Sequence, residues 1–163
     1  MRSKKAIINI TMTLLLQIVA IIYGFIIPKV IITSFGSEVN GLVSSITQFL
    51  AYITLLESGV GPVIKASLYK PIANKDKKEI ANVLRASEKF FRTISYIFIV
   101  YLIILAFIYP LIISTEFSYI YTLTLIIIIS ISTFAEYYFG MTYKLYLQAE
   151  QKTYVISIIQ IIT

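Results

Sequence analysis

The side chains of this sequence that could do chemistry lie inside apolar stretches. They are Gln17, Lys29, Glu57 and Glu136. Placing a charge in the middle of a membrane costs at least about 2.5 kcal/mol, so an ionisable side chain there usually faces protein or water and often marks a pathway. A glutamate in such a place can bind a proton or a cation. We therefore treat these four residues as candidates for a substrate or ion pathway.

The composition explains why these side chains stand out. Of the 163 residues, 58% are hydrophobic and 13% are charged, whereas a soluble protein has roughly half apolar and a quarter charged residues. We therefore expect an all-α, polytopic membrane helix bundle. The chain has no Cys and no His, which removes thiolate sites and the commonest general base and metal ligand. No catalytic set, phosphate-binding loop or Asp-rich metal motif is present, so we expect no enzyme, no metal site and no cofactor.

The apolar runs predict four complete transmembrane helices and the start of a fifth. The first run, 6–32, is too long for a signal peptide and longer than a hydrocarbon core of about 30 Å requires. The remaining predicted helices cover 41–63, 93–113, 118–143 and, in part, 154–163. The last run is too short to cross a bilayer. We therefore expect that further helices or partner subunits complete the bundle, or that the last run lies at the interface.

Each candidate residue has a functional and a structural interpretation. Gln17 lies on a stripe of small or weakly polar residues that suits either helix packing or a cavity. Lys29 lies near the outer end of the first helix, where anchoring at the interface is favoured. Glu57 either lines a cavity or pairs with Lys65 at the end of its helix. Glu136 either couples transport to a proton or cation, or makes a hydrogen bond that packs helices. Its predicted helix face also carries Thr122, Ser132, Thr133, Gly140 and Tyr143.

The basic residues predict the orientation in the membrane. If the N-terminus is cytoplasmic, every Lys and Arg except Lys29 falls on the cytoplasmic side, as topology rules require. A basic stretch between the second and third helices should set this orientation and contact lipid headgroups. It holds Lys65, Lys70, Lys75, Lys77, Lys78, Arg85, Lys89 and Arg92. Because these charges adjoin membrane helices, we expect the lipid bilayer, and not nucleic acid, as their partner.

The segment 76–92 has amphipathic helical spacing. Asp76 and Glu79 have the spacing of a capping box at its start. We expect a cytoplasmic helix that lies along the membrane interface, or else a solvated connector. The high content of Ile, Lys, Tyr and Asn suggests an AT-rich bacterial genome, so the predicted location is the bacterial cytoplasmic membrane.

Several short stretches resemble one family of membrane proteins. The stretches 55–62 (LLESGVGP) and 67–76 (SLYKPIANKD) are similar to the region of the second helix in bacterial polysaccharide repeat-unit flippases. These O-antigen and capsule transporters belong to the multidrug/oligosaccharidyl-lipid/polysaccharide exporter superfamily. The stretch 143–154 (YKLYLQAEQKTY) resembles the segment between their fourth and fifth helices, and 35–42 (FGSEVNGL) suits their first outer turn.

The resemblance implies a transport function. Members have twelve to fourteen helices in two related halves around a cationic cavity, and this chain would correspond to part of the N-terminal half. The implied substrate is an undecaprenyl-pyrophosphate-linked oligosaccharide, moved to the outer leaflet for surface polysaccharide synthesis. Because alternating access needs two bundles, we expect no transport by residues 1–163 alone. The alternatives are a cation-coupled multidrug or metabolite extruder of the same superfamily, and a membrane scaffold or assembly subunit that transports nothing.

Overall fold

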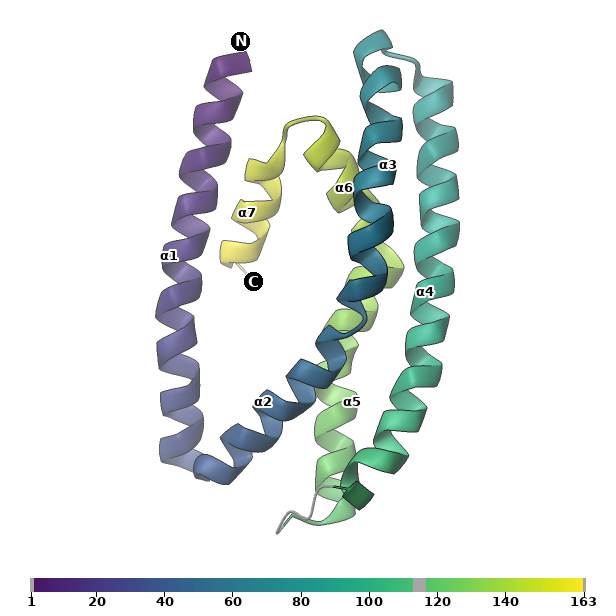
Figure 1. Ribbon diagram of the computed structural model, residues 1–163. Coiled ribbons are helices and arrows are strands. Elements are labelled where there is room, and N and C mark those ends of the chain that lie inside the picture. Colours follow the sequence, from purple (N-terminus) through teal and green to yellow (C-terminus); the bar gives the residue numbers. More distant parts are fainter. Residues whose placement is uncertain (1, 113–116, 163) are drawn as a thin grey trace.

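The computed structural model describes residues 2–112 and 117–162, and within these ranges it contains helices and no strand. Figure 1 shows long helices that run side by side, with one oblique helix among them. The elements are α1 (Arg2–Phe35), α2 (Ser37–Ala51), α3 (Thr54–Asn74), α4 (Lys77–Ile112), α5 (Tyr119–Ala135), the π-helix η1 (Glu136–Gly140), α6 (Met141–Ala149) and α7 (Thr153–Ile162).

Three helical stretches of the described chain are long and apolar enough to cross a membrane: Lys5–Phe35, Lys77–Leu111 and Tyr119–Ala149. The predicted all-helical fold is therefore confirmed for the described residues, and the length and composition of these helices are consistent with a membrane-embedded protein. The apolar helix α7 is shorter, and the number of four complete spans plus a fifth stays a prediction. The predicted turn at 114–116 lies outside the described residues.

The second predicted helix, 41–63, is divided in the structure. Helix α2 ends at Ala51 and α3 begins at Thr54. The amides of Tyr52 and Ile53 donate to the carbonyl groups three residues earlier, at 3.2 and 3.3 Å, which tightens the chain into a turn. Helix α3 then continues past the predicted end at residue 63 and contains Pro62 and Pro71. It stops at Lys75, whose φ of 55° is the left-handed conformation of a helix C-terminus.

The amphipathic segment 76–92 is the first part of α4 and does not form a separate interfacial helix. Asp76 caps it as predicted, because its Oδ1 accepts from the amides of Lys78 and Glu79 at 3.1 and 3.0 Å. Its apolar side chains pack into the core, where Phe91 is only 1% exposed. Other apolar side chains of this face, among them Val83 and Leu84, are partly buried against the same core. With no breaker near residue 93, the helix continues directly into the apolar run.

The predicted fourth helix, 118–143, corresponds to three consecutive elements. Ser118 caps α5 by accepting from the amide of Tyr121. The π-helix and α6 then extend the helical stretch to Ala149, beyond the predicted end at residue 143. The connection to α7 is therefore a short turn, in which Gln151 has a φ of 58°.

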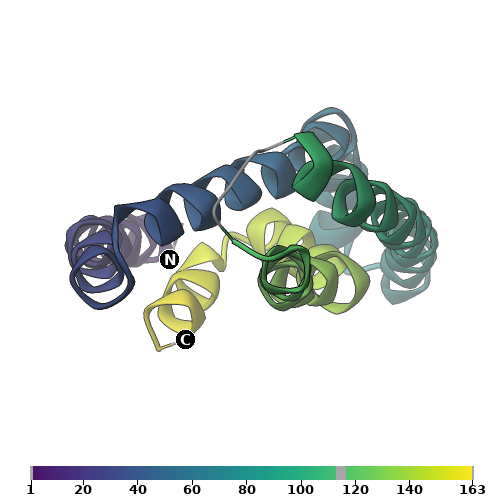
Figure 2. The same cartoon turned by 90° about the horizontal axis from the view of Figure 1, so that it is seen from below.

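Helices α2, α3, α4, α5 and α6 enclose the core, which includes the fully buried side chains of Leu68, Phe98 and Met141. Figures 1 and 2 show α1 on one side of the molecule and α4 on the other, with α2 crossing between them. Helix α1 packs on α2 near one end and on α7 near the other. The change of direction between α1 and α2 occurs at Gly36, whose φ of 92° suits a residue without a side chain.

Candidate functional site

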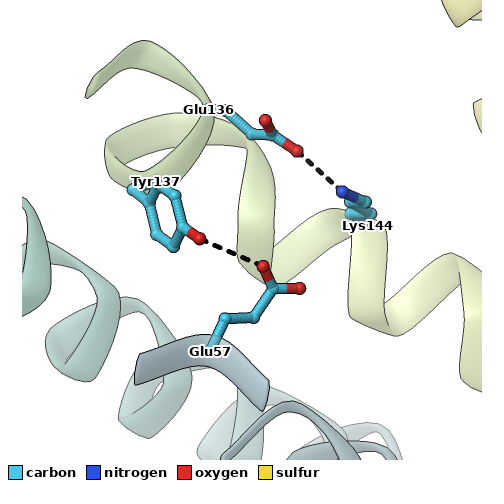
Figure 3. A network of polar contacts seen from close by, with 4 residues as sticks. All are labelled: Glu57, Glu136, Tyr137 and Lys144. Carbon is cyan, nitrogen blue, oxygen red and sulfur yellow. Dashed lines mark hydrogen bonds and ion pairs between the residues drawn. The ribbon is translucent and has the colours of Figure 1, made fainter. Parts of the chain in front are cut away.

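Polar side chains from three elements meet beside the turn between α2 and α3. Glu57 lies in the first turn of α3, immediately after the break at residues 52–53. Glu136 and Tyr137 are the first two residues of the π-helix, and Lys144 lies on α6. Figure 3 shows these four side chains directed toward one another. The site therefore depends on two irregular points of the backbone.

Two contacts connect the four residues in pairs. The Tyr137 hydroxyl donates to Oε2 of Glu57 at 3.1 Å, and Lys144 Nζ lies 2.7 Å from Oε1 of Glu136. Tyr137 is 2% exposed, so its ring is fixed by packing. The side chain of Glu136 is 46% exposed and that of Lys144 is 28% exposed. The Glu57 contact is thus anchored in the core, whereas the ion pair faces an open space.

That space is a cavity of about 310 Å³ between the α2–α3 turn and the α5–α6 stretch. All four residues line it, together with hydroxyl-bearing side chains that include Thr54, Ser132 and Thr133. The predicted association of Glu136 with Ser132 and Thr133 on one face is therefore found in the structure. Of the other residues on that predicted face, Thr122 is buried and Tyr143 donates to Glu88 at 3.0 Å.

The predicted pairing of Glu57 with Lys65 does not occur among the described residues, where Tyr137 is the hydrogen-bond donor to Glu57. Sequence reasoning missed both Tyr137 and Lys144 as members of the site. Tyr137 is one of many tyrosines in the apolar runs, and Lys144 lies just beyond the predicted end of the fourth helix at residue 143. On a regular α-helix, a lysine eight residues beyond a glutamate lies on a different face, so the spacing in the sequence does not by itself indicate the pair.

The other two candidates do not join this site. Gln17 and Lys29 are exposed on α1, and neither lines the cavity. On α1, Asn9 makes polar contacts with a distant part of the chain. Its side chain donates to the carbonyl of Gln151 and accepts from the amide of Tyr154, at 3.0 and 2.9 Å.

The predicted basic stretch forms one end of the molecule, on the last turns of α3 and the first turns of α4. Most of these side chains are exposed, and Lys65 is half-buried. The last of them, Arg92, places its guanidinium carbon 5.5 Å from the ring centre of Tyr138. Tyr138 belongs to the π-helix, so the site lies at the level where α4 changes from basic to apolar.

The arrangement combines two carboxylates, an ammonium group and several hydroxyl groups in one cavity. Carboxylate and hydroxyl oxygens can hold a proton or a hard cation, and the ammonium group can attract an anionic group such as phosphate. No group of three or more His, Cys, Asp or Glu residues that could hold a metal ion occurs in the described ranges. Comparisons with known protein families, curated proteins and solved structures find no match for this chain.

Proposed function

We propose that the chain is part of a membrane transporter that moves lipid-linked oligosaccharide repeat units across the bacterial cytoplasmic membrane for surface polysaccharide synthesis. The observation that carries this proposal is the polar cavity of Glu57, Glu136 and Lys144 between apolar helices. Ionisable side chains that line a cavity between apolar helices often mark a substrate or ion pathway. A cavity beside a broken helix is a common site for substrates and ions in transporters.

The π-helix supports a functional interpretation of the same cavity. A π-helix is rare, appears mostly as a single turn inside an α-helix, and occurs frequently at functional sites. Here it presents Glu136 and Tyr137 to the cavity. The substrate class comes from the stretches that resemble polysaccharide repeat-unit flippases. The proposed orientation, with the N-terminus in the cytoplasm, places the basic end of the molecule on the side where such a substrate is made.

A cation-coupled extruder is a second candidate, because the cavity holds two carboxylates. In that mechanism Glu57 or Glu136 would exchange a proton or a cation while a drug or metabolite moves. The single Tyr137 hydrogen bond to Glu57 leaves that carboxylate with further acceptor capacity.

A gene disruption in the native host tests these proposals together. The flippase proposal expects loss of surface polysaccharide and accumulation of the lipid-linked precursor, both restored by the native gene and not by Glu57→Gln or Glu136→Gln. Unchanged polysaccharide with increased sensitivity to cationic compounds would favour the extruder. If both variants restore every phenotype as well as the native gene, neither glutamate has a transport role and a scaffold is favoured.

A further inference from the structure

A second cavity lies on the other side of the Glu136–Lys144 ion pair. It has a volume of about 670 Å³ and is lined by both members of the pair, by α6 and by α7. Its walls are mostly apolar and include Ala135, Leu147 and Ile156. Cavities of about 300–1,000 Å³ with apolar walls and a few polar groups are typical of sites for small molecules and are found between the helices of bundles.

We propose that this cavity binds one phospholipid with a zwitterionic, hydrogen-bonding headgroup, of the phosphatidylethanolamine type. The lipid phosphate would contact the ammonium group of Lys144, and the lipid ammonium would contact the carboxylate of Glu136. An acyl chain would lie along the apolar walls. This cavity shares Glu136 and Lys144 with the cavity of the proposed transport function, but the binding of a phospholipid does not depend on transport.

The charges of the pair favour this headgroup over others. The contact uses Oε1 of Glu136 and one of the three N–H groups of Lys144, so both side chains keep hydrogen-bonding capacity. Their partial exposure makes that capacity accessible. A purely anionic headgroup would be repelled by Glu136. A headgroup that carries one charge of each sign meets an opposite charge at both ends.

The level of the pair in the molecule gives an independent argument. Arg92, beside the π-helix, is followed by the apolar part of α4 up to Ile112. These twenty or so residues span about 30 Å, which is the thickness of a hydrocarbon core. The ion pair therefore lies near one boundary of that core. Phospholipid headgroups lie at this boundary, and their acyl chains begin there.

Native mass spectrometry of the purified full chain tests the proposal. Phosphatidylethanolamine, phosphatidylcholine and phosphatidylglycerol with identical acyl chains are added separately. Phosphatidylcholine is the matched control lipid, because it has the same two charges but no N–H to donate to Glu136. We expect about tenfold more bound phosphatidylethanolamine than either other lipid, since one hydrogen bond to a charged group contributes a factor of this order.

Four variants test whether the Glu136–Lys144 ion pair causes the preference for phosphatidylethanolamine. Glu136→Gln and Lys144→Met should each reduce phosphatidylethanolamine to the level of phosphatidylcholine. The double variant E136K/K144E exchanges the charges and should keep the preference, because the headgroup can bind in the reverse direction. Glu150→Gln is the matched control, since it removes the carboxylate of the other ion pair, which does not line the cavity. Circular dichroism confirms that each variant keeps its helix content.

Equal binding of the three lipids by the native chain would overturn the proposal. A preference that survives in both Glu136→Gln and Lys144→Met would also overturn it, because the lipid would then lie elsewhere. The same conclusion follows if E136K/K144E keeps its helix content and loses the preference. The measurement detects bound lipid and needs no transport, so it can fail while the transport proposal stands.

Discussion

The side chain of Asn9 is predicted to hold α1 against the turn between α6 and α7. Its Nδ2 donates to the carbonyl of Gln151 at 3.0 Å, and its Oδ1 accepts from the amide of Tyr154 at 2.9 Å. Tyr154 lies in the first turn of α7, where backbone N–H groups have no partner within their own helix. Asn9→Ala removes both hydrogen bonds, so the carbonyl of Gln151 and the amide of Tyr154 lose these partners.

The expected loss of stability follows from these two bonds. An intramolecular hydrogen bond contributes about 0.5–1.5 kcal/mol net, and bonds between membrane helices average about 0.6 kcal/mol. We therefore expect Asn9→Ala to lower the free energy of unfolding by about 1–3 kcal/mol. Alanine is a better helix former than asparagine by up to about 0.7 kcal/mol. Thr11→Ala, at an exposed position of α1, gains nearly the same propensity and corrects for it.

Reversible unfolding in mixed micelles with a denaturing detergent measures this difference. A second readout measures the rate of crosslinking between Ile10→Cys and Thr153→Cys, at two positions that line the small cavity beside Asn9. The natural chain has no Cys, so a flexible thiol crosslinker joins only these two. Asn9→Ala should slow the crosslinking and Thr11→Ala should not. The reasoning is refuted if the two alanine variants have equal stability or equal crosslinking rates.

Three further predictions concern the rest of the chain. Hydrogen bonds from Lys152 and, to a smaller extent, from Tyr146 lower the pKa of Glu150 from its ordinary 4.5. The ionised Glu150 therefore stabilises the folded chain above pH 4.5, and this contribution is lost as the pH falls through the lowered pKa. Glu150→Gln should remove this part of the acid dependence of unfolding. A Cβ at Gly61 would lie 3.6 Å from Leu145 Cδ2, so Gly61→Ala should be tolerated, whereas Gly61→Leu should cost about 1–3 kcal/mol in the same unfolding assay. A reporter enzyme fused after Asn74 should be active on the cytoplasmic side, and activity on the outer side would contradict the predicted orientation.

Composition and periodicity were sufficient for the fold class and for much of the helix placement. The apolar runs 6–32 and 93–113 lie within α1 and α4 as far as the described residues extend. Asp76 was correctly predicted as a cap, because capping depends on a local side-chain contact. These features depend on contacts between residues that are close in sequence, so the local sequence is sufficient to predict them.

The break between α2 and α3 could not be predicted from the same local signals. Residues 52–54 contain no Gly or Pro, whereas Pro62 and Pro71 lie inside α3. A contact from another helix accompanies the break: the hydroxyl of Tyr101 on α4 donates to the carbonyl of Phe49 at 2.8 Å. This carbonyl belongs to the last turn of α2, where carbonyl groups need partners outside the helix. The partner is about fifty residues away, so no local pattern reveals it.

The ion pair of the candidate site was missed for a different reason, which is the twist of the helix. At about 100° per residue, a separation of eight residues places Lys144 about 80° away from Glu136 around a regular α-helix. The π-helix Glu136–Gly140 adds one residue to a turn, which removes about 100° of rotation and brings the two side chains to within about 20°. The glutamate and the lysine therefore share a face only because of this irregular turn. An amphipathic projection assumes uniform twist. It correctly placed Ser132 and Thr133 beside Glu136 in the first cavity, and Gly140 and Tyr143 beside it in the second, but it gave no reason to add Lys144 to that face.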